Sequence, residues 1–244
     1  MTRYKTEHLG GGYTVAVSED HTFGTDAVLL ADFASPNKND VVCDMGTGCG
    51  IIPMLLCRNS QGKHITGIEI QLNGYEQALE SVKLSNAQEK VNIINGDIKN
   101  IKELLPHGAF NVVIMNPPYK ASNGGIESKT DSARIARHEV ACTVDDVTTA
   151  AAHLLNFGGR LCLCNRPERL SDTIVSMRNA GIEPKRLRFV SKKADTAPWL
   201  FLIEGKKGAK PFMKVEAPLA LYDNCGELCR EVINIYGEYK ENHK

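Results

Sequence analysis

The sequence predicts an α/β protein with a doubly wound, mostly parallel sheet of seven strands. From residue 41 to residue 206, short apolar runs rich in β-forming residues alternate with segments of helical periodicity. Such alternation is typical of parallel sheets whose strands are joined by right-handed helical crossovers. Glycines and polar residues come directly after several of the apolar runs. The carboxyl ends of parallel strands share one edge of the sheet, and ligands bind at that edge.

The first three strands are predicted from apolar, β-rich runs and from the turn or helix behind each run. Residues 41–45 form the first run, and a helical pattern over 51–57 comes directly after a glycine-rich turn. Residues 64–70 predict a second strand and 73–86 the helix behind it. Residues 91–95 predict the third strand, which ends at an Asn-Gly-Asp turn.

The fourth strand is predicted at 110–115, where two prolines directly beyond Asn116 stop the ladder. The same alternation predicts the remaining elements. They are a helix at 144–155, a strand at 159–164, a helix at 167–179 and a closing antiparallel pair at 185–191 and 199–204. Only one such domain fits the chain, and we expect it to span residues 41–206.

Three regions lie outside the alternation. Residues 1–40 form an N-terminal extension, with a possible hairpin at 13–17 and an apolar helix at 26–33. Residues 120–142 are polar and predict a mobile loop. Residues 207–244 predict a C-terminal extension that packs on the same domain as a last strand and helix.

The composition argues against a membrane-spanning, secreted or metal-binding protein. The chain has 244 residues and no net charge, and it lacks the run of about 18 apolar residues that a membrane span needs. No apolar signal sequence is visible, and the eight cysteines show no metal-binding spacing. These features predict a cytoplasmic protein. Residues 158–214 hold 13 Lys and Arg against 5 Asp and Glu, which indicates either a surface that tracks phosphates or ordinary solvated charge.

The first predicted strand ends in Asp44 and three glycines at alternate positions, Gly46, Gly48 and Gly50. Such glycines permit a sharp turn and a close approach of a ligand to the backbone. The spacing differs from the GxGxxG fingerprint of nicotinamide dinucleotide enzymes. An acid two residues before the first glycine suits a ligand that carries an ammonium group. A dinucleotide oxidoreductase and a turn without a ligand remain alternatives.

Two further acids lie at the ends of the next strands. Glu69 ends the second strand, where a carboxylate can bind ribose hydroxyls. Asp97 comes after the third strand and could accept a hydrogen bond from an adenine amino group, with Ile98 supplying a backbone N–H and an apolar wall. The alternatives are an exposed charge for Glu69 and a helix N-cap for Asp97.

Asn116-Pro117-Pro118-Tyr119 is the most informative motif of the chain. It presents an amide side chain, backbone carbonyls and an aromatic ring at the end of a strand. This set suits a planar amino group, because carbonyl oxygens accept its hydrogens and a ring stacks on its face. The sequence therefore predicts a pocket for such a group beside the ligand of the glycine turn.

Together these motifs resemble the class I S-adenosylmethionine-dependent methyltransferases, over roughly residues 22–206. Four segments resemble, more narrowly, the tRNA (adenine-N6)-methyltransferases that modify adenosine 37 of valine tRNA. They are Phe23-Gly24-Thr25-Asp26, the glycine turn, the Asn-Pro-Pro-Tyr motif and Ala136-Arg137-His138-Glu139. The resemblance implies a Rossmann-like fold, S-adenosylmethionine as cofactor, S-adenosylhomocysteine as product, a tRNA substrate and no metal. It implies that the N-terminal extension closes over the cofactor.

The resemblance also assigns roles. Thr25 and Asp26 would lie near the methionine end of the cofactor, although Thr-Asp before an apolar helix is also an ordinary cap. The Asn116 oxygen and the Pro117 carbonyl would accept the two N6 hydrogens of a flipped adenine, with Asn116 bordering the cofactor as well. The expected substrate contacts are Pro118 and a stacking Tyr119, with Lys120, Arg137 and His138 toward RNA phosphates. A solvated helix face is the alternative for Arg137 and His138.

Other functions stay open at this point. A glutamine-N5 methyltransferase that acts on release factors also uses Asn-Pro-Pro-Tyr, because a glutamine amide is also a planar amino group. DNA adenine and rRNA guanine-N2 methyltransferases are weaker alternatives, and so is a cofactor-binding protein without catalysis. The sequence does not give the oligomeric state.

Overall fold

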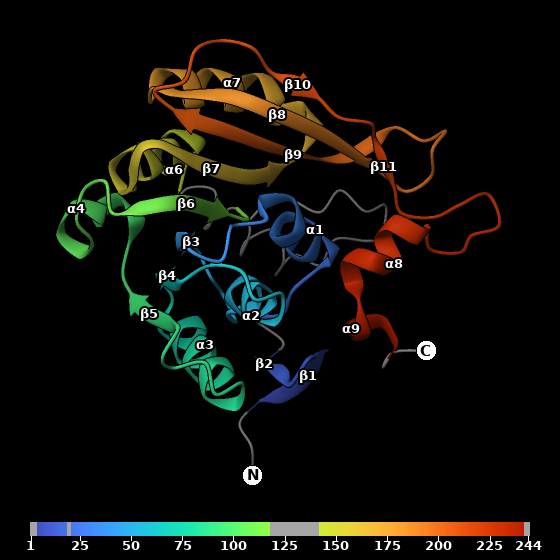
Figure 1. The fold of residues 1–244 in the computed structure, drawn as a ribbon, viewed down its shortest axis with the longest axis horizontal. Coiled ribbons are helices and arrows are strands. Elements are labelled where there is room, and N and C mark those ends of the chain that lie inside the picture. The colour runs from blue at the N-terminus through green and yellow to red at the C-terminus, as the bar shows by residue number, and fades with distance from the viewer. Residues whose placement is uncertain (1–3, 19–20, 118–141, 242–244) are drawn as a thin grey trace, which may run out of the picture.

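One sheet runs through the whole fold, and its strand order brings motifs that are distant in sequence to one edge. In the computed structural model, residues 4–18, 21–117 and 142–241 are described. Nine strands of this part form one sheet in the order β10-β8-β9-β7-β6-β3-β4-β5, with β11 beside β8 (Figure 1). The strands are β3 (Val41–Met45), β4 (His64–Glu69), β5 (Val91–Asn95), β6 (Phe110–Met115), β7 (Leu155–Asn165), β8 (Ile182–Ser191), β9 (Pro198–Lys207), β10 (Lys214–Val215) and β11 (Leu219–Ala220).

The sheet confirms the predicted fold class. Strands β5, β4, β3, β6 and β7 are parallel, and β9 lies antiparallel between β7 and β8. The order reverses at β3 and β6, which are hydrogen-bonded neighbours although β4 and β5 separate them in sequence. A crevice outside the strand ends forms at such a reversal. The seven predicted strands are present, and β10 and β11 extend the sheet beyond them with two residues each.

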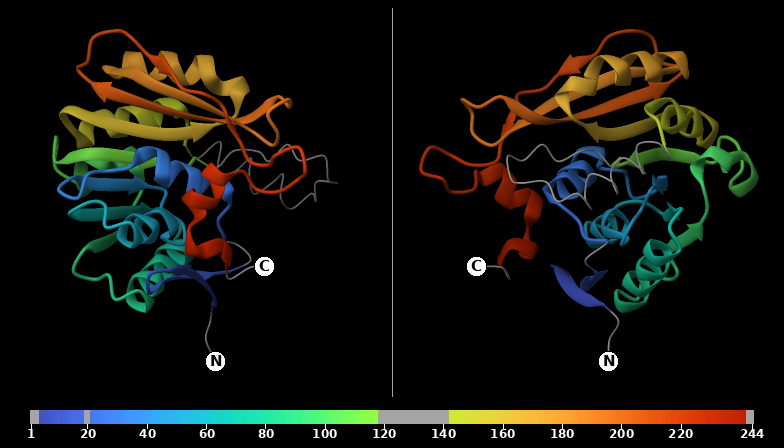
Figure 2. Two further views of the ribbon diagram at one scale, coloured as in Figure 1. Left: turned by 45° about the vertical axis from the view of Figure 1, so that its right-hand side comes forward. Right: turned by 180° about the vertical axis from the view of Figure 1, so that it is seen from behind.

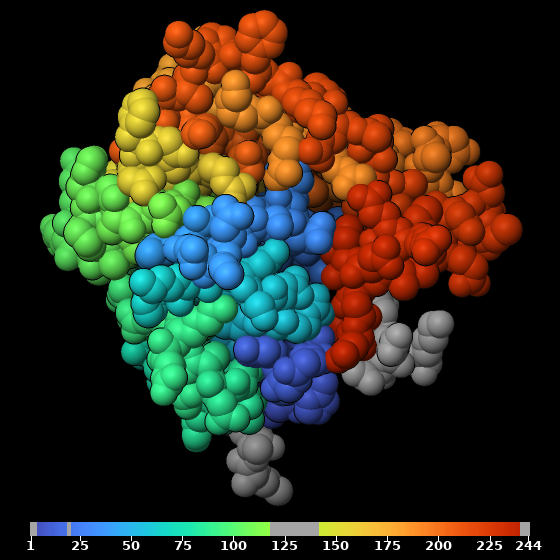
Figure 3. All heavy atoms as spheres, in the orientation of Figure 1, coloured from blue at the N-terminus to red at the C-terminus, as the bar shows by residue number. Residues whose placement is uncertain are grey.

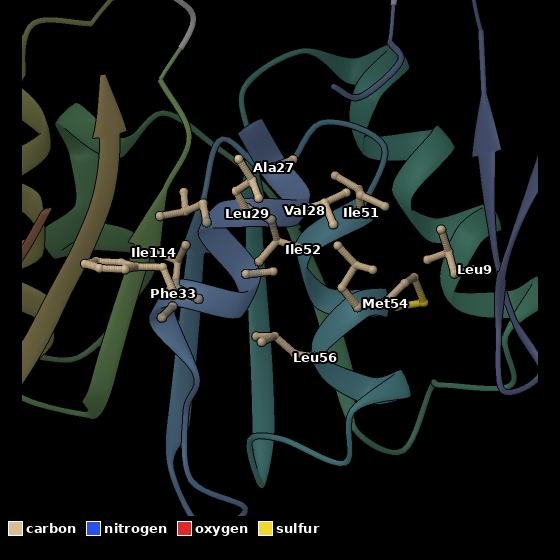
Figure 4. Close-up of a cluster of buried hydrophobic side chains, with 14 of the residues drawn as sticks. Leu9, Ala27, Val28, Leu29, Phe33, Ile51, Ile52, Met54, Leu56 and Ile114 are labelled. Carbon is tan, nitrogen blue, oxygen red and sulfur yellow. The ribbon is translucent and has the colours of Figure 1, made fainter. Parts of the chain in front are cut away.

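Helices cover both faces of the sheet. Successive side chains of each strand point to opposite faces, so a strand can pack against helices on both sides. On one face lie α1 (Thr25–Ala34), α2 (Ile51–Arg58) and α3 (Leu72–Leu84), whose apolar side chains pack with Val112 and Ile114 of β6. Figure 4 shows part of this cluster, including Leu29, Ile52 and Ile114. The other face carries η1 (Ile98–Asn100), α4 (Ile101–Leu104), α6 (Val144–Leu154), η2 (Pro167–Arg169) and α7 (Leu170–Asn179).

The N-terminal hairpin is tied to the fold by side chains at the end of α3. It consists of β1 (Lys5–Gly10) and β2 (Tyr13–Val17), which pair antiparallel as a two-stranded sheet of their own. The backbone N–H of Thr14 donates to Ser85 Oγ and that of Ala16 to Ser81 Oγ, both at 2.9 Å. The hairpin therefore docks on α3 through hydroxyl groups that accept from its backbone N–H groups, and Figure 2 shows the hairpin beside α3.

The C-terminal segment ends in α8 (Arg230–Tyr236) and α9 (Glu238–Glu241), which lie against α1 and the hairpin (Figures 1 and 3). Arg58, the last residue of α2, joins them. Its guanidinium donates to Leu9 O and Tyr236 O, each at 3.0 Å, and to Ile235 O at 3.4 Å. Burial lowers the pKa of Arg58, with the Glu238 and Asp32 carboxylates acting in the opposite direction.

Replacing Arg58 with methionine is expected to destabilise the protein by about 2 kcal/mol, because three backbone carbonyls lose a charged donor. Urea unfolding monitored by circular dichroism measures the change. Arg178→Met is the matched control, since the Arg178 side chain is 59% exposed and pairs across the surface with Glu183. Equal unfolding midpoints for the two variants would contradict the bridging role.

Candidate active site

The ends of four neighbouring strands bring the predicted site residues to one edge of the sheet. Asp44 lies in β3 and Glu69 ends β4, while Asp97 and Asn116 come after β5 and β6. The register pairs Met45 with Met115, so the glycine turn beyond β3 and Asn116 beyond β6 start side by side. The structure therefore assembles the predicted constellation at the topological reversal.

The glycine turn has a backbone that only glycine adopts without strain. Gly46, Gly48 and Gly50 have φ values of +69°, +54° and +81°. Gly50 is the N-cap of α2, and as a glycine it provides no side-chain cap to the first turn of this helix. A Cβ at Gly48 would meet no atom of the described residues within 4 Å. The turn is thus a cradle open to a ligand on the Gly48 side.

Asp44 is a buried acid with an unused oxygen. It is 1% exposed, and its Oδ2 atom is buried without a hydrogen-bond partner among the described residues. Burial raises the pKa of the Asp44 carboxyl to about 7, with the Thr47 hydroxyl opposing the rise and the Glu69 carboxylate adding to it. A buried acceptor of this kind needs a donor, and the ammonium group of the predicted cofactor fits it.

Glu69 is also buried, at 5% exposure, but both of its oxygens are occupied. Oε2 accepts from the Gly48 N–H and Oε1 from the Gln71 N–H, each at 2.9 Å. The alternative of an exposed strand-end charge is therefore wrong. A carboxylate has about four lone-pair positions, and the two backbone bonds use one on each oxygen. The other two positions can accept from a pair of hydroxyls while the backbone bonds hold the carboxylate in place.

Glu69→Gln is expected to lower the free energy of unfolding by about 1–3 kcal/mol, because the amide has one acceptor oxygen for two backbone donors and leaves a buried N–H unpaired. Thermal and urea unfolding measure the loss. Glu103→Gln, on the exposed side of α4, is the control and should change little. If the free energy of unfolding of Glu69→Gln equals that of the control, these two hydrogen bonds do not stabilise the fold.

Asp97 caps a helix and still lies at the predicted strand end. Its Oδ1 accepts from the Lys99 N–H at 2.9 Å, so it is the N-cap of the short helix η1, and this bond leaves its other oxygen for a ligand. The Ile98 side chain is 8% exposed and packs in the core below the sheet edge. Ile70, directly after Glu69, is 50% exposed and offers an apolar surface at the rim that sequence reasoning missed.

Asn116 is held from both ends of its amide. Nδ2 donates to Asp26 Oδ2 at 3.0 Å, and Oδ1 accepts from the Cys164 thiol at 3.1 Å. Asp26 thus contacts the predicted acceptor site directly. Thr25 Oγ1 lies 2.6 Å from Tyr236 Oη in α8. Sequence reasoning missed Cys164, because its pattern is that of one more apolar residue in a buried strand.

Several predicted residues lie outside the described part of the chain. These are Pro118, Tyr119, Lys120, Arg137 and His138, together with residues 120–141 of the predicted loop. Pro117 is described and half-buried, directly beyond Asn116. The roles of all these residues stay predictions.

Three arginines of the basic segment, Arg160, Arg186 and Arg188, form ion pairs within the protein. Arg160 pairs with Glu204 at 2.7 Å, and Arg186 reaches the same carboxylate at 3.3 Å. Arg188 forms two hydrogen bonds to Glu231, at 2.7 and 2.9 Å. These three arginines stabilise contacts between strands and with the C-terminal segment, and whether the other basic residues of the segment bind phosphates stays a prediction.

Comparison with known proteins agrees with this geometry. Residues 30–141 match the family of the TRM5/TYW2 methyltransferase domain. The chain is 29% identical to the tRNA1(Val) (adenine(37)-N6)-methyltransferase of Porphyromonas gingivalis over 71% of this chain and 75% of that protein. It is 28% identical to the protein of the same name from Tolumonas auensis, over 77% of each chain.

Solved structures share the fold. A predicted O-methyltransferase from Agrobacterium tumefaciens superposes with a TM-score of 0.70 at 19% identity, covering 86% of this chain and 95% of the other. TYW2 of M. jannaschii, solved in complex with AdoMet, gives a TM-score of 0.57 at 16% identity over 84% and 87% of the two chains. The sheet that carries the strand-end site thus has the same fold as these two proteins.

Proposed function

We infer that the chain, which is a class I S-adenosylmethionine-dependent methyltransferase, methylates N6 of an adenine in RNA, and that this adenine is adenosine 37 of a tRNA. The proposal is supported by the names of the similar curated proteins. The observation that carries it in the structure is the fixed Asn116 amide beside the cofactor cradle. Its oxygen is an acceptor for a planar amino group, which adenine presents at N6.

Each of three strand ends would bind a different group of the cofactor. Asp44 would hold the ammonium group, Glu69 the ribose hydroxyls and Asp97 the adenine amino group, with Ile70 as an apolar wall. When bound, S-adenosylmethionine supplies a methyl group on a positively charged sulfur. The cradle and its buried, unpaired Asp44 oxygen are suited to orient that group toward Asn116.

The acceptor residues prepare the base. A target adenine leaves its stack and enters the pocket, where Asn116 Oδ1 and the Pro117 carbonyl accept its two N6 hydrogens. These bonds bias the nitrogen lone pair out of conjugation and toward the methyl group. Positioning supplies most of the acceleration. Bound S-adenosylmethionine would supply the methyl group to this nitrogen with loss of its bond to sulfur, and the proton of the nitrogen would then leave to solvent.

S-adenosylhomocysteine is the expected product, and the cytoplasm the expected compartment, because tRNA is the substrate. No described helix has the length and hydropathy to cross a bilayer. Catalysis of this kind needs no metal, since the leaving sulfur is already charged.

The test is to incubate the protein with radiolabelled S-adenosylmethionine and either total tRNA or a release factor. Transfer to tRNA alone is the expected result. Transfer to the release factor alone would establish the glutamine-N5 alternative, because a glutamine amide presents the same planar amino group to Asn116. Cofactor binding with no transfer to either would contradict the assignment of an RNA acceptor.

A further inference from the structure

We propose that Asp26 and Cys164 fix the orientation of the Asn116 amide, so that its oxygen faces the acceptor amino group. This inference rests on the function proposed above, because it concerns the same acceptor pocket. It gives Asp26 a positioning role toward the acceptor in place of direct contact with the cofactor, and it adds Cys164 to the site.

Hydrogen-bond chemistry determines which way round the amide lies. A carboxylate only accepts, so Asp26 Oδ2, 3.0 Å from the amide, selects the nitrogen side of Asn116. The Cys164 thiol, 3.1 Å from the opposite end, donates to the oxygen side. Each partner matches one end of the amide and opposes the flipped arrangement.

A flipped amide would be unproductive. It would turn an N–H of Asn116 toward the amino group of the adenine, so two donors would face each other where a bond is needed. In the observed orientation, Oδ1 has two lone pairs, one for Cys164 and one for an N6 hydrogen. The Asp26 bond also polarises the amide and strengthens its oxygen as an acceptor.

Gly24 makes room for this arrangement. A Cβ at position 24 would lie 2.5 Å from Asp26 Oδ1, so the carboxylate would have to shift from its observed position. The backbone at Gly24, with φ −115° and ψ 179°, is one that any residue adopts. An alanine at this position would therefore act by displacing the Asp26 carboxylate, and not by straining the backbone. Asp26 lies in the first turn of α1, where the helix dipole favours a negative charge.

Cys162 provides an internal comparison. Both thiols are fully buried in β7, two residues apart and on the same face of the sheet. The Cys162 thiol contacts Glu204 Oε2 at 3.7 Å instead of the Asn116 amide. Removing either thiol costs similar packing, but only the loss of Cys164 affects the Asn116 amide.

The experiment compares Asp26→Asn, Gly24→Ala, Cys164→Ala, Cys164→Ser and the control Cys162→Ala. An asparagine at position 26 donates as well as accepts, so it no longer selects one orientation. We expect kcat with tRNA to fall roughly 10- to 100-fold in Asp26→Asn and Gly24→Ala, and roughly 3-fold in Cys164→Ala. Cys164→Ser keeps a donor and should restore most of the activity, and Cys162→Ala should match the parent. The affinity for S-adenosylmethionine, measured calorimetrically, should not change.

An infrared measurement tests the geometry without catalysis. The S–H stretching band of Cys164 is identified by its loss in Cys164→Ala, and we expect it to shift to higher frequency in Asn116→Ala as the thiol loses its acceptor. An unshifted band overturns the role of Cys164.

The kinetic measurements test Asp26 separately. If Asp26→Asn weakens cofactor binding and leaves kcat unchanged, the positioning role of Asp26 is overturned. If the parent protein transfers to a release factor instead of tRNA, the proposed function fails, and the same variants test the amide orientation with that acceptor.

Discussion

Replacing Asn116 with alanine is expected to reduce methyl transfer to tRNA by about two to three orders of magnitude. In the proposed function the amide oxygen is the fixed acceptor for one N6 hydrogen, and removal of one such preorganised group typically costs this much in kcat. The affinity for the cofactor should be nearly intact, because Asp44, Glu69 and the glycine turn remain. Single-turnover transfer and calorimetric titration of S-adenosylmethionine measure the two quantities.

Asn111→Ala is the matched control for this variant. Asn111 lies in the same strand β6, and its Oδ1 accepts from the Val41 N–H at 2.8 Å, away from the carboxyl edge. The control should lose some stability and keep its turnover. If Asn116→Ala retains the turnover of Asn111→Ala, the amide is not the acceptor of the amino hydrogens.

The second large effect is expected at Asp44, whose replacement by asparagine should stabilise the cofactor-free protein at alkaline pH while weakening cofactor binding. The pKa of this carboxyl is about 7 in the fold against 3.8 for an ordinary aspartate. Between these values the folded protein retains a proton that the unfolded chain has lost, so the stability of the parent falls as pH rises through this window. The loss amounts to about 4 kcal/mol when complete.

An asparagine does not titrate, so the variant escapes this loss. Its stability relative to the parent should rise from about pH 4 to about pH 8, as measured by urea unfolding at several pH values. A constant difference across this range would contradict the raised pKa of Asp44. The affinity for S-adenosylmethionine should decrease in this variant. At about pH 8 we expect it to be at least about 30-fold lower than in the parent, because a buried ammonium loses its charged partner.

The same pKa predicts a proton linkage in the parent protein. An ammonium ligand requires the ionised carboxylate, so binding below pH 7 should release a proton from Asp44, and affinity should rise as pH approaches about 7. Titration calorimetry in two buffers of different ionisation enthalpy measures the released proton. No release at about pH 6 would mean that Asp44 does not bind the ammonium group.

The parts of the site that the sequence predicted are those where local pattern suffices. Asp44, Glu69 and Asp97 lie at the ends of recognisable strands, and the parallel topology brings all strand ends to one edge. Asn116 was predictable for the same reason, since two prolines mark the end of β6. These residues required no knowledge of distant contacts.

The parts that were missed depend on contacts far apart in sequence. Asp26 and Asn116 are separated by 90 positions, and nothing in a buried cysteine shows that its thiol reaches an amide. The charge of the basic segment was countable, but its partners Glu204 and Glu231 were not. Strands of two residues, such as β10, have no periodicity to detect.

The most direct test of the central claim is the identity of the methylated nucleoside. tRNA methylated by the protein with labelled S-adenosylmethionine would be digested to nucleosides and separated by liquid chromatography with mass spectrometry. We predict that the label is found in N6-methyladenosine and is lost with Asn116→Ala. Label in a methylated guanosine or cytidine, or in N6-methyladenosine at full yield from Asn116→Ala, would contradict adenine-N6 transfer at Asn116.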